Sequence, residues 1–346
     1  MKRFFLTIII GAFFKVAVAQ DPQFSQFYAA PLSHNPAFTG SGYAPRIIFN
    51  YRNQWPSLTA NFVTSAVSVD HYIDKYNSGV GILLSQDEQG AGQLKNTSIS
   101  GLYSYQLQVG DEHHVRFGVQ GTYSNYTADF SGLTFPDQFS SGGLTGSPTS
   151  DPYVSYTLNN PVKIVDFSTG VLYYNPKAFI GFSVHHLTRP ELGITNSSNT
   201  NYLERKFSVN GGLNIALSDA YTSAASEKLT LTPAFLFKKQ GGFSQLDLGA
   251  YVTYSPLTFG VWYRGLPIKR KDISSVNQDA LVALAGFRFE SFSFGYSYDL
   301  TISSLGSRSG GSHEISVAYQ FDPLDFDSNK NPHIRARKKY LSCPKF

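Results

Sequence analysis

From residue 46 onward, hydrophobic and polar residues alternate along most of the chain. In 292–303, Phe, Tyr, Leu and Ile occupy the even positions, and Ser, Gly, Asp and Thr the odd ones. The same period of two runs through 207–218 and 244–254. Because successive side chains of a strand point to opposite faces, this period indicates strands with one apolar face. No helical period of comparable strength interrupts it, so the sequence predicts an all-β fold.

The pattern predicts fourteen strands, most of them about 9–13 residues long. Strands of soluble sheets are most often about 5–6 residues long, whereas a tilted strand needs roughly 9–11 residues to cross a bilayer. An even number of long, aromatic-rich strands therefore predicts a 14-stranded antiparallel transmembrane outer-membrane β-barrel over 46–321. The alternative is a secreted β-sandwich or lectin-like domain, whose solvent faces would carry more charge. The predicted strands are 46–55, 61–72, 78–86, 94–109, 113–128, 164–175, 178–187, 204–218, 227–239, 243–255, 257–265, 279–290, 292–303 and 312–321.

The predicted connections alternate in length. Every second one is short, around 74–77, 110–112, 176, 256 and 291, with a longer exception near 219–226. The others include long segments at 129–163, 188–203 and 266–278, although 56–60 and 240–242 are short. Outer-membrane barrels have short periplasmic turns and longer external loops. We therefore expect both chain termini in the periplasm.

Residues 1–19 have the features of a secretory signal peptide: a basic start, an apolar run and small residues before Gln20. The apolar run, Phe4 to Phe14, is too short to span a bilayer. Only 15% of residues are charged, against about 25% in soluble domains, so the surface is expected to meet something less polar than water. The single Cys, Cys343, excludes a disulfide scaffold.

Motifs at both ends of the chain resemble a known family. DPQFSQFY and NPAFTG follow the leader, NYRNQWP lies in the first strand, HEISVAYQF forms the last one, and the chain ends in CPKF. This order resembles the PorP/SprF family of Bacteroidetes outer-membrane proteins, which are tied to type IX secretion and gliding motility. The resemblance implies a non-enzymatic barrel without a cofactor. It implies partners among secreted adhesins or other type IX substrates and among periplasmic components that reach the peptidoglycan.

The segment 20–45 has no strand pattern and contains four prolines, which cannot donate to a sheet ladder. It is nonetheless rich in apolar side chains, which an extended periplasmic tail would not leave exposed. Eight strands are filled by their own side chains, and 16–18 leave a channel, so fourteen should leave a lumen. We expect Gln20–Tyr43 to plug or line the periplasmic mouth, or else to pack as a latch for the first strand. The candidate plug or partner-binding residues here are Phe24, Phe27, Tyr28, Asn35 and Pro36.

Arg52 and Trp55 lie on or beside the first strand. Arg52 shares strand parity with Asn50, so it should point inward and pair with an acid such as Asp247 or Asp299. A direct partner contact is the alternative role for this arginine.

The last predicted strand ends in two outward aromatic residues, Tyr319 and Phe321, which resemble the signal read by the barrel-assembly machinery. The chain then continues as a polar tail, 322–346, whose basic residues are interleaved with apolar ones. Docking on an acidic periplasmic partner and a solvated, disordered tail are the two interpretations. The candidate residues of the tail are Arg335, Arg337, Lys338, Lys339, Tyr340 and Phe346.

Catalytic and metal-binding patterns are weak. His113-His114 and His185-His186 are adjacent on predicted strands, so the members of each pair point to opposite faces. Asp87-Glu88, in a predicted surface loop, is a candidate for loose cation binding. No HExxH or GxSxG motif is present. The sequence therefore predicts an anchor or receptor for a type IX-secreted surface protein, with a diffusion channel for small solutes as the alternative and no nucleic-acid partner.

Overall fold

The computed structural model describes residues 21–90, 94–130, 132–151, 154, 161–192, 202–217, 229–266, 277–303 and 306–322. The expected signal peptide and the candidate residues of the tail lie outside this part of the chain. Among the described residues, no helix has the length and apolar character needed to cross a membrane.

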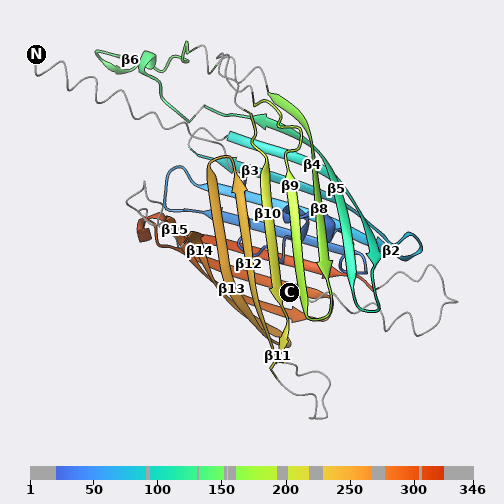
Figure 1. Ribbon diagram of the computed structural model, residues 1–346. Coiled ribbons are helices and arrows are strands. Elements are labelled where there is room, and N and C mark those ends of the chain that lie inside the picture. The colour runs from blue at the N-terminus through green and yellow to red at the C-terminus, as the bar shows by residue number, and fades with distance from the viewer. Residues whose placement is uncertain are drawn as a thin grey trace, which may run out of the picture.

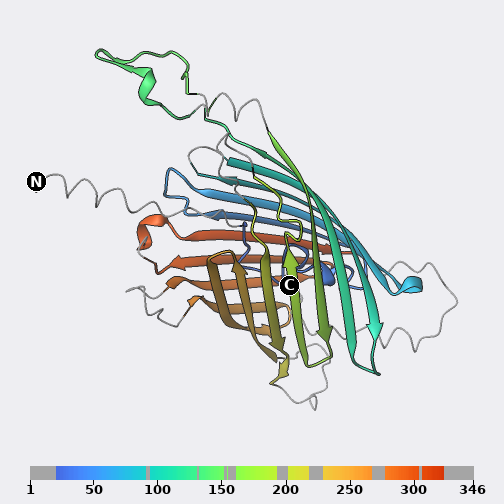
Figure 2. The ribbon, with the colours of Figure 1, turned by 45° about the horizontal axis from the view of Figure 1, so that its top comes forward.

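Fourteen long antiparallel strands form a closed barrel (Figures 1 and 2). The first strand closes on the last through nine residue pairs, from Arg46↔Gln320 to Gln54↔Ser312. The strands are β1 (Arg46–Gln54), β2 (Phe62–Ile73), β3 (Ser78–Gln89), β4 (Leu94–Gln108), β5 (His114–Thr127), β8 (Val162–Tyr174), β9 (Ala178–His185), β10 (Lys206–Leu213), β12 (Leu229–Gln240), β13 (Phe243–Tyr254), β14 (Leu257–Leu266), β15 (Asn277–Phe289), β16 (Phe292–Thr301) and β17 (Ser312–Gln320). The predicted fold class and strand number are confirmed.

Short elements complete the described chain. The two-residue strand β11 (Ile215–Ala216) continues β10 along β12, and β6 (Phe139–Ser140) and β7 (Gly143–Leu144) form a small hairpin in the longest loop. The helical turns are α2 (Pro31–His34), η1 (Pro36–Phe38), η2 (Asp74–Tyr76), η3 (Pro136–Gln138) and η4 (Gly306–Ser309).

The two ends of the barrel differ. We call the end that carries the connections 74–77, 109–113, 175–177, 255–256 and 290–291 the turn end. The opposite end, which carries 55–61, 128–161, 186–205, 241–242 and 302–311, is the loop end. Figure 1 shows β6 projecting beyond the barrel wall at the loop end.

Side-chain exposure follows the predicted alternation. On β1, Ile47 and Tyr51 are 38% and 37% exposed, whereas Asn50 and Arg52 are 2% exposed. Similar apolar residues are exposed on the other strands. Because the polar residues face inward and the apolar ones outward, the barrel is the inverse of a water-soluble sheet, as a membrane barrel requires.

Several strand boundaries differ from the prediction by one or a few residues, and two of the differences are informative. The predicted strand 204–218 is divided at Asn214 into β10 and β11, although the Asn214 amide still donates to the Lys177 carbonyl in register with the β9–β10 pairing. β3 extends to Gln89, so the expectation that Asp87 lies in a surface loop is wrong. Asp87 is buried, and its carboxylate accepts a hydrogen bond from Thr64. A polar run is compatible with a strand here because the inner face of the barrel is polar.

The hydrophobic core lies inside the barrel and joins the wall to the segment before β1. Pro31 and Pro36 each begin a helical turn, a position where the missing amide hydrogen is not needed. These turns place Phe27, Leu32 and Phe38 against inward side chains of several strands. The wall residues of this core include Leu172, Leu236, Tyr251, Trp262, Val282 and Leu284.

Inward glycines allow the backbone of this segment to approach the wall. A Cβ on Gly118 of β5 would lie 2.3 Å from the Pro36 carbonyl carbon, and one on Gly79 of β3 would lie 2.1 Å from the Thr39 carbonyl oxygen. Neither position leaves room for a side chain. Gly101 of β4 faces outward, and a Cβ there would meet nothing within 4 Å.

We predict that Gly118→Ala destabilises the folded barrel by about 1–3 kcal/mol, the usual effect of overpacking. The matched control is Gly101→Ala, which adds the same methyl group on the outer face. The measurement is the thermal unfolding midpoint of both variants in detergent, followed by heat-modifiable gel mobility. Equal midpoints for the two variants would contradict the close approach at Gly118.

Candidate functional site

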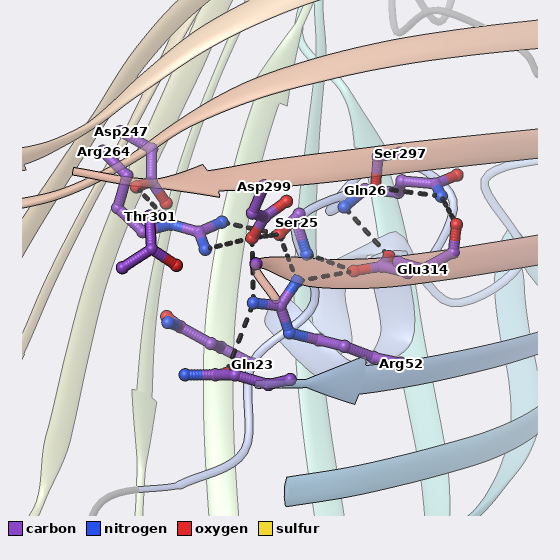
Figure 3. Close-up of polar contacts among 12 residues, drawn as sticks. Gln23, Ser25, Gln26, Arg52, Asp247, Arg264, Ser297, Asp299, Thr301 and Glu314 are labelled. Atoms are coloured by element: carbon purple, nitrogen blue, oxygen red, sulfur yellow. Dashed lines mark hydrogen bonds and ion pairs between the residues drawn. The ribbon is translucent and has the colours of Figure 1, made fainter. Parts of the chain in front are cut away.

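The candidate site is the contact between residues 21–43 and the inner wall of the barrel. Its centre is a network of buried charges contributed by five strands (Figure 3). Arg52 of β1 pairs with Asp299 of β16 at 2.8 Å and with Glu314 of β17 at 3.4 Å. Arg264 of β14 pairs with the same Asp299 at 2.8 Å and with Asp247 of β13 at 3.1 Å. The inward orientation of Arg52 and its pairing with Asp299 are confirmed, whereas Asp247 pairs with Arg264.

Residues 25 and 26 complete this network. The backbone amides of Ser25 and Gln26 donate to the Glu314 carboxylate at 2.6 and 3.0 Å. The Ser25 hydroxyl donates to Asp299 at 2.7 Å, and the Gln26 amide group donates to the Glu314 carbonyl at 3.0 Å. Buried carboxylates need such partners, because each unmet hydrogen bond of a buried charged group is costly. The segment therefore supplies hydrogen bonds that the wall lacks by itself.

The predicted residues of the segment lie in two groups. Phe27 packs edge-on against Trp262 with ring centroids 4.9 Å apart, and Tyr28 packs edge-on against Tyr251 at 5.1 Å. Asn35 is fully buried and donates to the carbonyls of Val171 and Phe182 at 3.3 and 3.2 Å.

Of the remaining two predicted residues, Pro36 directly follows Asn35 and Phe24 lies near the start of the segment. Pro36 begins η1, where its carbonyl carbon approaches Gly118. Phe24 is partly buried against the core. All five residues thus contact the inner wall or the core inside it.

A second polar cluster holds the first described residue at the loop end. Asp21 accepts hydrogen bonds from His186 at 2.8 Å and Lys206 at 2.5 Å, and the other ring nitrogen of His186 lies 2.8 Å from Asp166. Burial alone would raise the pKa of Asp21, but Lys206 and His186 together lower it well below its ordinary value. Burial also disfavours the charged imidazole, yet Asp21 and Asp166 outweigh it and raise the pKa of His186 to about 9.

A third cluster holds the segment at the turn end. The Gly40 amide donates to Asp70 at 2.7 Å, and Arg46 pairs with the same carboxylate at 2.9 Å. The Tyr43 hydroxyl lies 2.5 Å from that of Tyr174. The segment therefore reaches from one end of the barrel to the other. The expectation that it stays at the mouth where the first strand begins is wrong for its first residues, because their charged partners lie at the loop end.

Trp55 lies at the loop end, where its ring packs edge-on against Phe62 at 5.5 Å. Both rings line a cavity of about 380 Å³, together with Phe24, Arg52 and Phe243. This cavity is bounded on one side by the segment itself.

Tyr319 and Phe321 lie at the turn end. Their rings are in edge contact at 4.7 Å, and Tyr319 also packs on Phe292 at 4.7 Å. Phe321 is 42% exposed. Their role in barrel assembly stays a prediction.

The histidines have other partners than a metal ion. His113 contacts the Tyr173 hydroxyl at 2.6 Å, and His185 contacts the His34 carbonyl at 3.0 Å. Within the part of the chain that the structure describes, no group of three or more His, Cys, Asp or Glu residues could hold a metal ion.

Sequence reasoning missed Glu314, Arg264, Asp21 and the inward glycines. Glu314 and Arg264 carried a usable signal, since each is a lone charge at an inward position of a predicted strand. The contacts of Asp21 and Gly118 carried none, because they depend on the path of a segment that has no period.

We predict that Arg52→Leu destabilises the barrel by about 3–5 kcal/mol, the typical effect of removing one partner from a buried ion pair. The substitution leaves the Glu314 carboxylate without the guanidinium group of Arg52. Tyr51→Leu, one residue away on the outer face, is the control and should change stability far less. The thermal unfolding midpoint in detergent measures both. A midpoint for Arg52→Leu that matches the control would show that the network contributes little.

The cluster at Asp21 predicts a pH dependence. A pKa of His186 raised from 6.5 to about 9 contributes stability that is fully present below pH 6.5 and is lost as the pH rises through 9. This loss is on the order of 3 kcal/mol. The difference in unfolding midpoint between the wild type and His186→Gln should therefore shrink from pH 6 to pH 10. A difference that stays constant over this range would contradict the charged state of His186.

Three comparisons relate this chain to known proteins. A search of curated proteins finds no match. Among solved structures, the outer membrane protein Omp33 of Acinetobacter baumannii is similar over 81% of this chain and 98% of its own, with 5% identity and a TM-score of 0.42. BamA of Haemophilus ducreyi lacking POTRA domains 1–3 is similar over 80% and 70%, with 8% identity and a TM-score of 0.38.

The family comparison covers nearly the whole barrel. The family described as type IX secretion system membrane protein PorP/SprF matches residues 16–319, which include the segment before β1 and all fourteen long strands except the last residue of β17. The chain therefore belongs to the PorP/SprF family of type IX secretion system membrane proteins.

Proposed function

We propose that this outer-membrane barrel is a non-enzymatic scaffold of type IX secretion. It receives or anchors a secreted surface protein, such as a gliding adhesin, and links it to the periplasmic machinery. The observation that carries the proposal is the occupation of the lumen by residues 21–43, which bond to the wall at both ends and at the centre. A barrel whose inner polar groups bind its own chain is suited to holding a partner at its rims. It is poorly suited to passing solutes.

In this proposal the turn end faces the periplasm, as short turns do in outer-membrane barrels. The loop end then offers the surface for the secreted partner. Part of that surface is ordered by its own contacts: the Asp137 carboxylate accepts hydrogen bonds from the Ser150 amide and from the Thr149 and Ser150 hydroxyls. The Ser150 amide bond and the Thr149 bond lower the pKa of Asp137, so the carboxylate stays charged and the loop keeps these contacts well below neutral pH.

The periplasmic partner would meet the turn end and the basic tail. The tail lies outside the described residues, so its contribution rests on the sequence: six basic residues and no acidic one follow Asn329. An acidic periplasmic protein is the complementary partner, and its attraction to the tail would weaken with salt.

The test is a mild-detergent pull-down through an affinity tag inserted at Gly142, which is exposed in the β6–β7 turn. We expect a large surface protein and periplasmic type IX components to copurify with the barrel. A variant ending at residue 322 should lose periplasmic components while it retains the surface protein.

The purified barrel is then tested in planar bilayers, where we expect no steady ion conductance. A variant without residues 21–43 is the positive control for an open lumen, provided that its heat-modifiable mobility shows a folded barrel. A wild-type barrel that is recovered alone and conducts ions would overturn the scaffold and make the protein a diffusion channel.

A further inference from the structure

The first and last residues of 21–43 contact opposite ends of the barrel. Asp21 bonds to His186, Lys206 and Gln240. These three residues lie at the loop end: His186 follows β9, Lys206 begins β10, and Gln240 ends β12. The first described residue is therefore fixed at the loop end by three independent partners.

The contacts between Asp21 and Tyr43 do not descend evenly, since Tyr28 packs on Phe179 near the turn-end start of β9 whereas the His34 carbonyl contacts His185 at the loop-end terminus of this strand. Gln26 bonds to Glu314, the third residue of β17 from its loop-end start. Asn35 then bonds to Val171 and Phe182, deeper in the barrel. Tyr43 finally bonds to Tyr174, the last residue of β8 at the turn end.

The positions of Asp21 and Tyr43 indicate that the segment passes once from one end of the lumen to the other. A hairpin that entered and left at the turn end would bring Asp21 back beside Tyr43, which its partners at the loop end exclude. The chain is long enough for the passage: β1 rises about 30 Å over its nine residues, whereas the 23 residues 21–43 can extend over roughly 75 Å. The excess length is taken up by the turns α2 and η1.

The barrel wall is also closed around the segment. β1 and β17 pair along their whole length, so the segment has no lateral exit. It must lie inside before this seam closes, or be threaded through the lumen afterward.

We propose that the mature chain begins at the loop end, so that residues 21–24 are displayed among the long loops on the side opposite to the start of β1 and the end of β17. With the turn end in the periplasm, as under the proposed function, this places the amino-terminal residues on the outer face of the cell. It replaces the sequence-based expectation of a periplasmic N-terminus. These residues also line the 380 Å³ cavity, with Trp55, Phe62 and Phe243 on its other side, and so form part of the external surface.

The test is cysteine labelling of intact cells with a membrane-impermeant maleimide. The single native cysteine is first removed by Cys343→Ser. Pro22→Cys then reports on the segment, Gly142→Cys on the loop end and Glu112→Cys on the turn end; all three positions are exposed, and none of the three side chains makes a contact described above. We expect Pro22→Cys and Gly142→Cys to label in intact cells, and Glu112→Cys only after the outer membrane is permeabilised.

Labelling of Pro22→Cys only after permeabilisation, while Gly142→Cys labels in intact cells, would overturn the proposal. Each variant is first checked for a folded barrel by heat-modifiable mobility, so that a misfolded sample is not scored. The result is independent of the pull-down, because the side of the membrane on which a residue lies does not depend on the protein that binds there. The labelling thus reports where residues 21–24 lie, and the pull-down and bilayer measurements report whether the barrel is a scaffold or a channel. Either proposal can therefore fail while the other stands.

Discussion

Two carboxylates inside the barrel, Asp299 and Glu314, set the requirement that the rest of the structure meets. A barrel of fourteen strands is wider than its own inward side chains can fill. Charged groups on its inner wall therefore need partners that the neighbouring strands supply only in part. Arg52 and Arg264 neutralise the charge, and the backbone amides of residues 25 and 26 satisfy the remaining hydrogen bonds of Glu314. The wall carboxylates and residues 25 and 26 therefore satisfy each other's hydrogen bonds.

The outer and inner faces of the barrel wall are in different environments. On the outer face, a Cβ added at Gly101 would meet no atom within 4 Å, so this position has room for a side chain. Inside, the described residues of the segment approach the wall at glycines such as Gly118, at polar side chains that bond to them, and at rings such as that of Trp262. This difference explains why one methyl group is expected to be harmless on one face and disruptive on the other.

The same asymmetry distinguishes the two ends. Short turns give the turn end a compact rim, whereas the loop end carries the long connections, the cavity and the Asp21 cluster. Under the proposed function, this difference would separate the surface for a secreted partner from the surface for periplasmic components. Residues 21–43 form hydrogen bonds with the wall at both ends of the barrel.

The sequence by itself determined the barrel. Its period of two, its strand lengths and its alternating connections depend only on local geometry and on the contrast between lipid and a polar interior, so strand number and the inward position of Arg52 could be predicted. The polar end of β3 was missed because hydropathy cannot separate a loop from a strand whose inner face is polar. The path of residues 21–43 was decided by the tertiary structure alone. That path depends on which distant groups, such as His186, Lys206 and Glu314, need a partner, and on where Gly118 leaves room for a backbone, and neither condition has a periodic trace in the sequence.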